Sequence, residues 1–396
     1  MKIWILSDYD SRKHLAVKNL LARFHAEYPE HKAGFEVLSR RSLWDALFAH
    51  LRDPKSSPAA DLIELPQSWT PLFAKLGLLA DLSGQLEGPA ARYPDFVRRN
   101  CLPAEGGSVY AMPWWVEIIC LHYRADSLKK ISKAPEADLA AWEGLLDVCG
   151  RLKAACRKKD YYPLENSNPS GAVSAADVLP CVWSRGGDLF SEGFSRCAVT
   201  RAETVRGMED YLGLAAKEYM PLFEENFHES GFLSSGLSDM VFSGRLPIQV
   251  KTAGRGAQMR PVPYPSFGKP VSPCFVNSLA LCSGSAGAEG PSALLKWLLD
   301  PRQARYFTNA FGAFPCHRQP LEDALDASRH GGMYRKLLEN ARLRPGVTAY
   351  PTCEQLLDAA LAGAALRSAE RDYDGEDLRR ELIKIQGEID YLLSIY

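Results

Sequence analysis

The residues with the clearest chemical potential are two tryptophans and a carboxylate in the stretch Gly107–Arg124. Trp114 and Trp115 come just before Glu117, and Pro113 introduces them in an extended conformation. Flat apolar rings beside a hydrogen-bond acceptor suit a polyhydroxylated ligand, because its C–H faces pack on rings and its hydroxyls donate to carboxylates. A core strand with two packed tryptophans has the same pattern, so the position in the fold must decide between the two.

The elements around these residues predict a buried strand. The segment Val116–Tyr123 is almost continuously apolar and rich in branched and aromatic side chains, which is typical of a strand covered on both faces. Because side chains alternate along a strand, we expect Trp115 and Glu117 on one side and Trp114 on the other, as a packing residue.

Polar and aromatic residues also follow the predicted strands of the N-terminal third. Apolar runs and helical spacing alternate there as strand, helix, strand, helix, strand, which predicts a parallel sheet with helices on its faces. The expected strands are Lys2–Leu6, Phe35–Leu38 and Ala60–Leu65, and the expected helices begin near Arg12, Ser42 and Pro66. Asp8, Tyr9 and Asp10 follow the first strand and Trp69 follows the third, at the edge where open α/β sheets bind ligands. Trp44 begins a helix, where packing is the simpler interpretation.

The rest of the chain predicts a more helical half. Helical spacing marks segments near Trp142–Cys156, Val178–Trp183, Val205–Tyr219, Ser292–Leu299 and Arg302–Ala310. Met240–Val250 is expected to form a helix end, a glycine turn and a strand, and Arg260–Pro270 is too rich in proline for regular structure. Val276–Leu281 is a further apolar strand. The C-terminal helix carries one apolar stripe, Leu378 to Leu392, which we expect to pack on its own domain, with dimerisation as the alternative.

No catalytic, metal or cofactor signature accompanies these elements. The chain lacks Gly-x-Ser-x-Gly, His-Glu-x-x-His, Gly-x-x-x-x-Gly-Lys and a Gly-x-Gly-x-x-Gly after a strand. Its eight histidines are dispersed, with no pair at helical ligand spacing. The sequence therefore predicts no cofactor, no metal site and no enzyme.

The composition is that of an ordinary globular protein. The formal net charge of −1 over 396 residues is not that of a nucleic-acid-binding protein. No apolar run reaches the roughly 18 residues of a membrane span, and Met1–Ser7, followed by Asp8, is expected to be a strand and not a secretion signal. Ten cysteines occur without a Cys-x-x-Cys pair, as small core residues in a reducing compartment would. As printed, the sequence points to the cytoplasm.

Several short segments occur in a characteristic order over nearly the whole chain. They are Ala60-Asp-Leu-Ile-Glu-Leu65 with Leu76-Gly-Leu-Leu-Ala-Asp-Leu82, Val109-Tyr-Ala-Met-Pro113, Leu121–Leu128, Ala141-Trp-Glu-Gly-Leu-Leu146, Trp183-Ser-Arg-Gly-Gly-Asp188 and Phe311-Gly-Ala-Phe-Pro315. In this order they resemble the bacterial extracellular solute-binding proteins of the maltose-binding type, which are the ligand receptors of ABC sugar importers.

The resemblance implies a two-lobed α/β fold of the type II periplasmic binding proteins. Each lobe is expected to be a mostly parallel sheet flanked by helices, with a ligand cleft between the lobes. The expected N-terminal lobe comprises residues 1–113 and 262–313, and the expected C-terminal lobe comprises residues 114–261 and 314–396. The implied function is non-covalent capture of a small polar solute, most directly a carbohydrate, by hinge closure of a monomeric receptor that serves ABC permease subunits. By position, the predicted ligand-binding residues are Tyr9, Asp10, Trp44, Glu64, Trp69, Trp115, Glu117, Trp183 and Gly187, together with Lys251 and Tyr264.

The chain departs from the family pattern in three ways. It begins without an export signal, it carries many cysteines, and it has Gln249-Val-Lys-Thr252 where the family has glycine and an aromatic residue. The resemblance implies a periplasmic or extracellular, membrane-associated location, whereas the first two departures leave a cytoplasmic one open. A cytoplasmic ligand sensor on the same fold and an enzyme on a related two-lobed fold are the alternatives. Oligosaccharides, polyols, polyamines and peptides with a cationic end all fit tryptophan beside glutamate, so the sequence does not identify the ligand.

Overall fold

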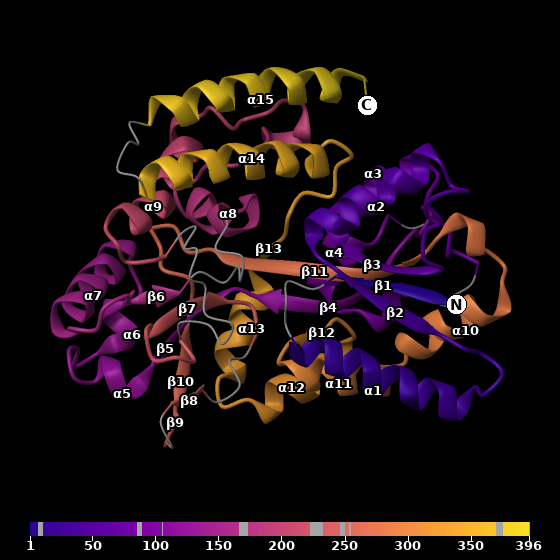
Figure 1. Cartoon of the computed structure of the whole chain (residues 1–396), viewed down its shortest axis with the longest axis horizontal. Coiled ribbons are helices and arrows are strands. Elements are labelled where there is room, and N and C mark those ends of the chain that lie inside the picture. The colour runs from indigo at the N-terminus through magenta and orange to yellow at the C-terminus, as the bar shows by residue number, and fades with distance from the viewer. Residues whose placement is uncertain are drawn as a thin grey trace.

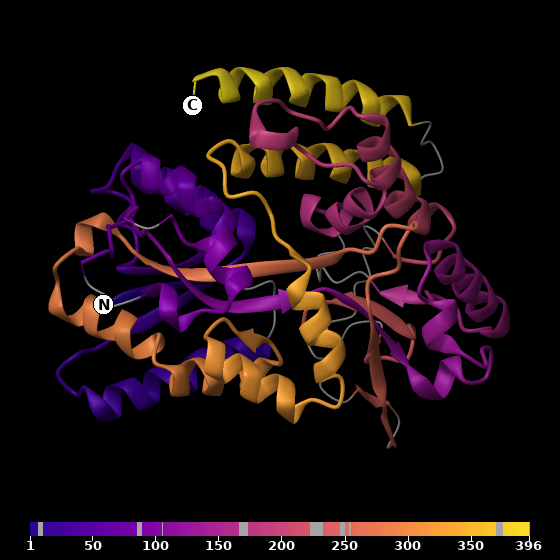
Figure 2. The same cartoon turned by 180° about the vertical axis from the view of Figure 1, so that it is seen from behind.

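The computed structural model describes residues 1–6, 11–84, 89–104, 106–165, 173–221, 233–245, 250–252, 255–369 and 375–395. Within these residues the strands form a seven-stranded sheet, a four-stranded sheet and a two-stranded ribbon. Helices cover the two larger sheets, which lie side by side (Figure 1, Figure 2). We call the seven-stranded sheet with its helices the first lobe and the four-stranded sheet with its helices the second lobe. The two-lobed α/β architecture predicted from the sequence is confirmed.

The sheet of the first lobe has the strand order β12-β4-β11-β3-β1-β2, with β13 beside β11. Its strands are β1 (Lys2–Leu6), β2 (Gly34–Leu38), β3 (Leu62–Pro66), β4 (Met112–Ile118), β11 (Ser272–Leu281), β12 (Phe314–Pro315) and β13 (Ala341–Arg342). β1 is parallel to β2 and β3, whereas β11 is antiparallel to β3 and β4. The sheet is therefore mixed and not mostly parallel, because β4 carries the chain out of the first lobe and the neighbouring β11 carries it back.

The two faces of this sheet are buried under different helices. Along β1, Ile3 and Ile5 belong to one apolar core, and Trp4 and Leu6 belong to the other. Helices α1 (Ser11–Glu27), α4 (Asp95–Cys101), α10 (Glu289–Leu298), α11 (Pro301–Phe311), α12 (Arg318–Ala327) and α13 (Gly331–Glu339) cover the core around Ile3. Helix α2 (Arg40–Arg52), the short helix η1 (Gln67–Trp69) and helix α3 (Thr70–Lys75) cover the core around Trp4.

The sheet of the second lobe has the strand order β10-β5-β7-β6. Its strands are β5 (Cys120–Arg124), β6 (Leu164–Glu165), β7 (Met240–Ser243) and β10 (Met259–Val262), and β8 (Val250–Thr252) with β9 (Arg255–Ala257) forms the ribbon. Met240–Ser243 is thus a strand and not the predicted helix end. Arg260–Val262 is also a strand, contrary to prediction. Because β10 lies at the edge of the sheet, Pro261 is tolerated there.

One apolar core joins this second sheet to its main helices. The helices of the lobe are α5 (Ala125–Leu128), α6 (Pro135–Asp138), α7 (Trp142–Ala155), α8 (Ala175–Ser184), α9 (Ala202–Ala216), α14 (Tyr350–Ala369) and α15 (Glu376–Ile395). The stripe of α15 from Leu378 to Ile389 is buried in this core, so the helix packs on its own lobe as predicted. No helix in the described ranges is long and apolar enough to cross a membrane.

The described chain passes from one lobe to the other at three places. β4 ends at Ile118 and β5 begins at Cys120, so the predicted strand Val116–Tyr123 is divided between the two sheets. The Ile119 N–H at this break donates to the Pro273 carbonyl at 2.9 Å. The chain returns between β10 and β11, and it leaves the first lobe again between β13 and α14.

Candidate functional site

Glu64 organises the carboxyl edge of the first sheet. Its buried carboxylate accepts hydrogen bonds from Lys13 Nζ at 2.7 Å, from Trp115 Nε1 at 2.7 Å and from the Leu6 N–H at 3.1 Å. These four residues, the Glu64 cluster, join the end of β1, the start of α1, β3 and β4. Since a buried charge is tolerated only when it is paired, the cluster fixes these elements relative to one another.

The polar groups of Lys13 and Trp115 are bonded to Glu64 and to its neighbours within the protein. Burial raises the pKa of the Glu64 carboxyl above its ordinary value, and the Lys13 ammonium and the Trp115 indole oppose that rise. Lys13 also donates to the Leu6 carbonyl and lies 4.6 Å from the centre of the Trp115 ring. Trp115 itself is only 2% exposed. Ligand binding by Trp115 and Glu64 stays a prediction, and in this structure both residues hold the edge of the sheet together.

Glu117 and Arg245 form a partly exposed ion pair where the chain crosses between the lobes. Arg245 Nε donates to Glu117 Oε1 at 2.9 Å, and the side chains are 18% and 17% exposed for Arg245 and Glu117. Glu117 lies near the end of β4, whereas Arg245 follows β7 in the second lobe. The guanidinium lies 5.8 Å from the centre of the Trp115 ring. This pair offers both an acceptor and donors to a polar solute.

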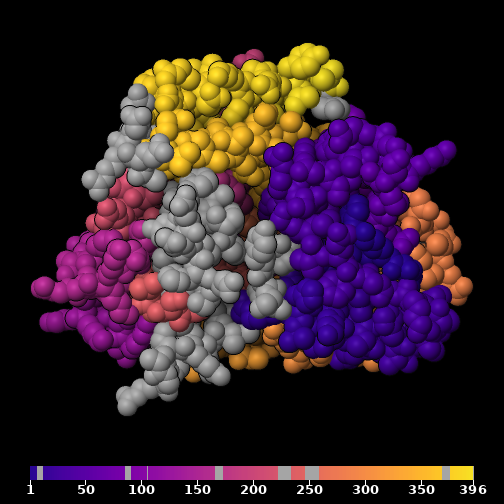
Figure 3. All heavy atoms as spheres, viewed as in Figure 1, coloured from indigo at the N-terminus to yellow at the C-terminus, as the bar shows by residue number. Residues whose placement is uncertain are grey.

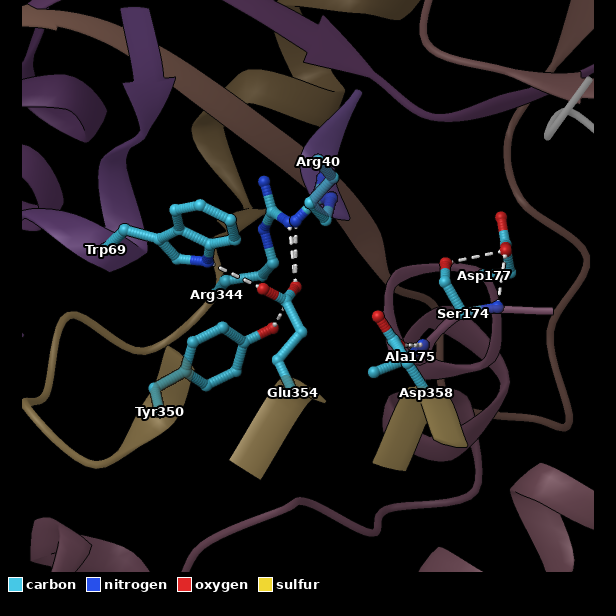
Figure 4. Close-up of polar contacts among 9 residues, drawn as sticks. All are labelled: Arg40, Trp69, Ser174, Ala175, Asp177, Arg344, Tyr350, Glu354 and Asp358. Atoms are coloured by element: carbon cyan, nitrogen blue, oxygen red, sulfur yellow. Dashed lines mark hydrogen bonds and ion pairs between the residues drawn. The ribbon is translucent and has the colours of Figure 1, made fainter. Parts of the chain in front are cut away.

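Trp69 and Trp44 lie together in the first lobe, and Trp69 reaches the second lobe. The centres of their rings are 5.3 Å apart. Trp69 is fully buried, and its Nε1 donates to Glu354 Oε2 at 2.8 Å. Because Glu354 belongs to α14, this hydrogen bond joins the two lobes (Figure 4).

Glu354 is surrounded by donors. Its Oε1 accepts from Arg40 Nη1 at 3.0 Å, from Arg344 Nη1 at 3.1 Å and from the Tyr350 hydroxyl at 3.3 Å, and these groups converge on the carboxylate in Figure 4. We call Arg40, Trp69, Arg344, Tyr350 and Glu354 the Glu354 cluster. Burial raises the pKa of the Glu354 carboxyl, but the two guanidinium groups and the indole outweigh it and bring the pKa below its ordinary value. The carboxyl is therefore ionised at neutral pH.

Asp358 follows Glu354 by one turn of α14 and behaves differently. Its Oδ1 accepts the N–H of Ala175, the first residue of α8, at 2.6 Å, so this contact lies within the second lobe (Figure 4). Burial, and after it the charge of Glu354, raises the pKa of Asp358 to about 7. Glu354 and Asp358 thus differ both in protonation and in the lobe that they contact.

Two of the second-lobe candidates lie in tightly packed positions. Trp183 is 1% exposed, and its Nε1 donates to Asp188 Oδ1 at 3.3 Å. The Arg342 guanidinium lies 4.8 Å from the centre of its ring. A Cβ added at Gly187 would lie 2.7 Å from the Thr204 backbone nitrogen, so this position requires glycine for packing. No described contact joins Trp183 or Gly187 to the candidate residues of the first lobe.

The structure says less about the remaining predicted ligand-binding residues. Tyr264 is 3% exposed, and its ring centre lies 4.7 Å from that of Phe242. Lys251 lies in β8, but its side chain is outside the described part of the structure. Tyr9 and Asp10 lie outside the described residues. Ligand binding by these residues stays a prediction.

Several charged residues of the two clusters, and the partner of Glu117, were not predicted from the sequence. The missed residues are Lys13, Arg40, Arg245, Arg344 and Glu354. A signal existed for three of them, because a charge on an apolar helix face needs a buried partner. Lys13 shares a face with Val17 and Leu20, and Glu354 shares one with Leu357 and Leu361. Arg40 shares a face with Leu43 and Leu47 in the same way. Arg245 and Arg344 lie outside helices, and only the tertiary structure reveals them.

These polar groups gather where the lobes meet. In Figure 3 the C-terminal helices of the second lobe, in gold and yellow, lie against the first lobe, in indigo and purple. The Glu117–Arg245 pair and the Glu354 cluster each combine residues of both lobes. In the part of the chain that the structure describes, no three His, Cys, Asp or Glu side chains lie close enough together to hold a metal ion. The junction is suited to non-covalent binding of a polar solute.

The model of a protein family described as bacterial extracellular solute-binding proteins matches residues 26–319 of this chain. The chain belongs to this family. A relative from Deinococcus radiodurans, named "Probable ABC transporter-binding protein", is 28% identical over 142 residues. That match covers 34% of this chain and 32% of the relative, so the chain spans about a third of the relative's length.

Solved structures of other solute-binding proteins share the fold over the whole chain. Maltose-bound MalE3 of T. maritima has a TM-score of 0.79 at 17% identity, with 99% of each chain covered. An ABC substrate-binding protein from Listeria monocytogenes in complex with cycloalternan has a TM-score of 0.78 at 14% identity, with 100% of this chain and 98% of that chain covered. The Thermus thermophilus maltotriose binding protein, bound with maltotriose, has a TM-score of 0.76 at 14% identity, with 99% of each chain covered.

Removing Lys13 tests the Glu64 cluster. Lys13→Met leaves the Glu64 carboxylate buried without its cation, which should lower the free energy of unfolding by about 3–5 kcal/mol. Adding Glu64→Gln removes the uncompensated charge and keeps an acceptor for the Trp115 indole, so the double variant should recover part of the loss. Chemical unfolding at neutral pH measures both. A double variant no more stable than Lys13→Met would contradict the pairing.

The raised pKa of Asp358 predicts a specific pH dependence. The unfolded carboxyl ionises near its ordinary pKa of about 3.9, whereas the folded protein keeps this proton up to about pH 7. The unfolded state therefore loses its proton first, and the folded state loses relative stability as the pH rises from about 4 to about 7.

Asp358→Asn removes this titration and keeps an acceptor for the Ala175 N–H. The variant should melt at a higher temperature than the wild type at pH 8, and its advantage should shrink at pH 5. Thermal unfolding across this range measures the difference. Parallel profiles of melting temperature against pH for the two proteins would show that Asp358 does not titrate in this way.

Proposed function

We propose that this protein reversibly binds a small polar solute, most directly a carbohydrate, as the substrate-binding component of an ABC importer. The observation that carries the proposal is the two-lobed family fold with a charged pair, Glu117 and Arg245, partly exposed where the lobes meet. The solved structures of similar fold hold maltose, maltotriose and cycloalternan. The name of the partial relative supports an ABC transporter as partner.

The Glu117–Arg245 pair supplies the chemistry that a sugar needs. The Glu117 carboxylate would accept hydrogen bonds from hydroxyl groups, and the Arg245 guanidinium would donate to hydroxyl and ring oxygens. Because the two groups already satisfy each other at 2.9 Å, a solute would exchange one charge-assisted hydrogen bond for several of its own. Tyr9, Asp10 and Lys251 complete the proposed site by resemblance to the family.

The buried tryptophans have a supporting role in this proposal. Trp115 and Trp69 each donate their indole N–H to a buried carboxylate, and these bonds hold the sheet edge and the lobe junction in place. The other candidates that we assign to support of the site are Trp44, Glu64, Trp183, Gly187 and Tyr264. The proposed ligand contacts are thereby concentrated on partly exposed polar groups.

We also propose new boundaries for the two lobes that move during closure. Residues 1–118 with 272–342 would form one rigid body, and residues 120–262 with 350–395 would form the other. These boundaries replace the ones expected from the sequence, which lie after residues 113, 261 and 313. The support is that β4 pairs with β11 in the first sheet, and that α12 and α13 pack in the core of the first lobe. Hinge motion would then occur in the segments between these ranges.

In this proposal the protein is a monomeric binding protein without catalysis or cofactor. It binds no nucleic acid, and it acts outside the cytoplasmic membrane with ABC permease subunits, as the family's description supports. Ten free thiols favour a second candidate, a cytoplasmic ligand sensor on the same fold. Adjacent genes separate the two, because an importer lies beside permease genes and a sensor beside a regulator or kinase gene.

A panel of sugars and polyols tests the carbohydrate assignment. A ligand that binds only the folded state stabilises it, by about 2.7 kcal/mol at one hundred times its Kd. At least one sugar or polyol at millimolar concentration is expected to raise the melting temperature. An unchanged melting temperature across the whole panel would contradict a carbohydrate ligand.

Glu117→Gln tests the position of the site with the best ligand of that panel. Loss of the charge should weaken binding by about 1.5 kcal/mol, roughly tenfold, while the fold survives, because Glu117 is partly exposed. Glu36→Gln is the matched control, since Glu36 pairs with Lys2 at the β2 edge of the same sheet. Calorimetric titration should show wild-type affinity for the control. Equal affinities of the two variants would place the ligand elsewhere.

A further inference from the structure

The Glu354 cluster joins the lobes through residues from three parts of the chain. Arg40, at the start of α2, and Trp69, in η1, belong to the first lobe. Tyr350 and Glu354 belong to α14 of the second lobe, and Arg344 lies in the segment that leads from β13 to α14. Figure 4 shows the side chains of both lobes pointing to the same carboxylate.

The Glu354 carboxylate obtains its partners from this chain alone. Oε1 accepts from Arg40, Arg344 and Tyr350, and Oε2 accepts from Trp69, at distances from 2.8 to 3.3 Å. A carboxylate has about four acceptor sites, so these donors satisfy it. Since Glu354 is 1% exposed, the contact between the lobes needs neither solvent nor a solute.

Opening the lobes would remove half of these donors. Arg344 and Tyr350 lie within ten residues of Glu354 in the chain, whereas Arg40 and Trp69 lie 314 and 285 residues away. Separation would therefore exchange the hydrogen bonds from one guanidinium and from the indole N–H for hydrogen bonds to water, with a net loss of stability. This cost opposes opening whether or not a ligand is present.

We infer that Glu354 is a positioning residue that holds the two lobes closed in the absence of ligand, through Arg40 and Trp69. Only the effect of this contact on solute binding rests on the proposed function. A solute must wait for this contact to break before it enters, so the contact lowers the apparent affinity by the fraction of molecules that are open. Weakening the contact would increase the rate of solute entry.

The chain offers a matched control on the same helix. Asp358 lies one turn after Glu354, and its carboxylate contacts the Ala175 N–H of the second lobe. Asp358→Asn therefore changes a carboxylate of α14 without removing a bond between the lobes. Arg40→Ala and Trp69→Phe remove first-lobe partners of Glu354, and Trp69→Phe does so by deleting the indole N–H of a large apolar side chain.

Small-angle X-ray scattering of the full chain without ligand measures the closure. The wild type is expected to match the scattering of the closed structure, with a radius of gyration of about 21 Å for a compact chain of this length. Glu354→Gln, Arg40→Ala and Trp69→Phe are expected to increase the radius of gyration and the maximum dimension. Asp358→Asn is expected to scatter like the wild type, and circular dichroism verifies that each variant is folded.

Two results would overturn the inference. One is a ligand-free wild type that scatters as an open molecule, and the other is a wild-type radius in every folded variant of the cluster. If Glu354→Gln fails to fold, Arg40→Ala still decides, because Arg40 is 22% exposed and its loss disturbs little of the core. No ligand enters this experiment, so its outcome is independent of whether a carbohydrate binds.

Discussion

A buried carboxylate is stable only with a full set of donors, and two such carboxylates determine how this protein is assembled. Glu64 and Glu354 share two kinds of partner, although they lie in different lobes. Each accepts the indole N–H of a tryptophan at 2.7 or 2.8 Å, and each pairs with a cation that also lies near the face of that tryptophan. Glu64 holds the edge of the first sheet together, and Glu354 fastens the second lobe to that sheet's helices.

This constraint changes the role of the aromatic residues. Trp115 and Trp69 have the residue type that stacks on sugars, yet their polar atoms are committed to protein carboxylates. In the proposed function, a solute at the junction would therefore meet groups that remain partly exposed, such as Glu117 and Arg245. Because these two groups neutralise each other, we propose that the junction favours an uncharged polyhydroxylated solute over a strongly charged one. A rigid edge behind exposed polar groups is what selective non-covalent binding requires.

Much of the fold could be predicted from the sequence, because strand and helix periods and the order of short motifs are local signals. The division of Val116–Tyr123 at Ile119 was not predictable, since an apolar run does not reveal that its two halves belong to different sheets. The site was harder to predict for the same reason. Trp115 and Glu117 were predicted as site residues through residue type, but their partners Lys13 and Arg245 are 102 and 128 residues away in the chain. Only tertiary packing shows that Glu64 is buried with its partners and that Glu117 stays partly exposed.

The central proposal is that a solute binds between the two lobes beside Glu117. A crystal structure of the full chain with the sugar or polyol that gives the largest thermal shift tests this claim most directly. We expect ligand density enclosed by both lobes, with hydroxyl groups of the ligand within hydrogen-bond distance of Glu117 and Arg245. Density elsewhere would contradict it, as would an intact Glu117–Arg245 pair with no ligand near it. The surface pocket between α9 and α15, lined by Val205, Leu382 and Ile383, is one such other location.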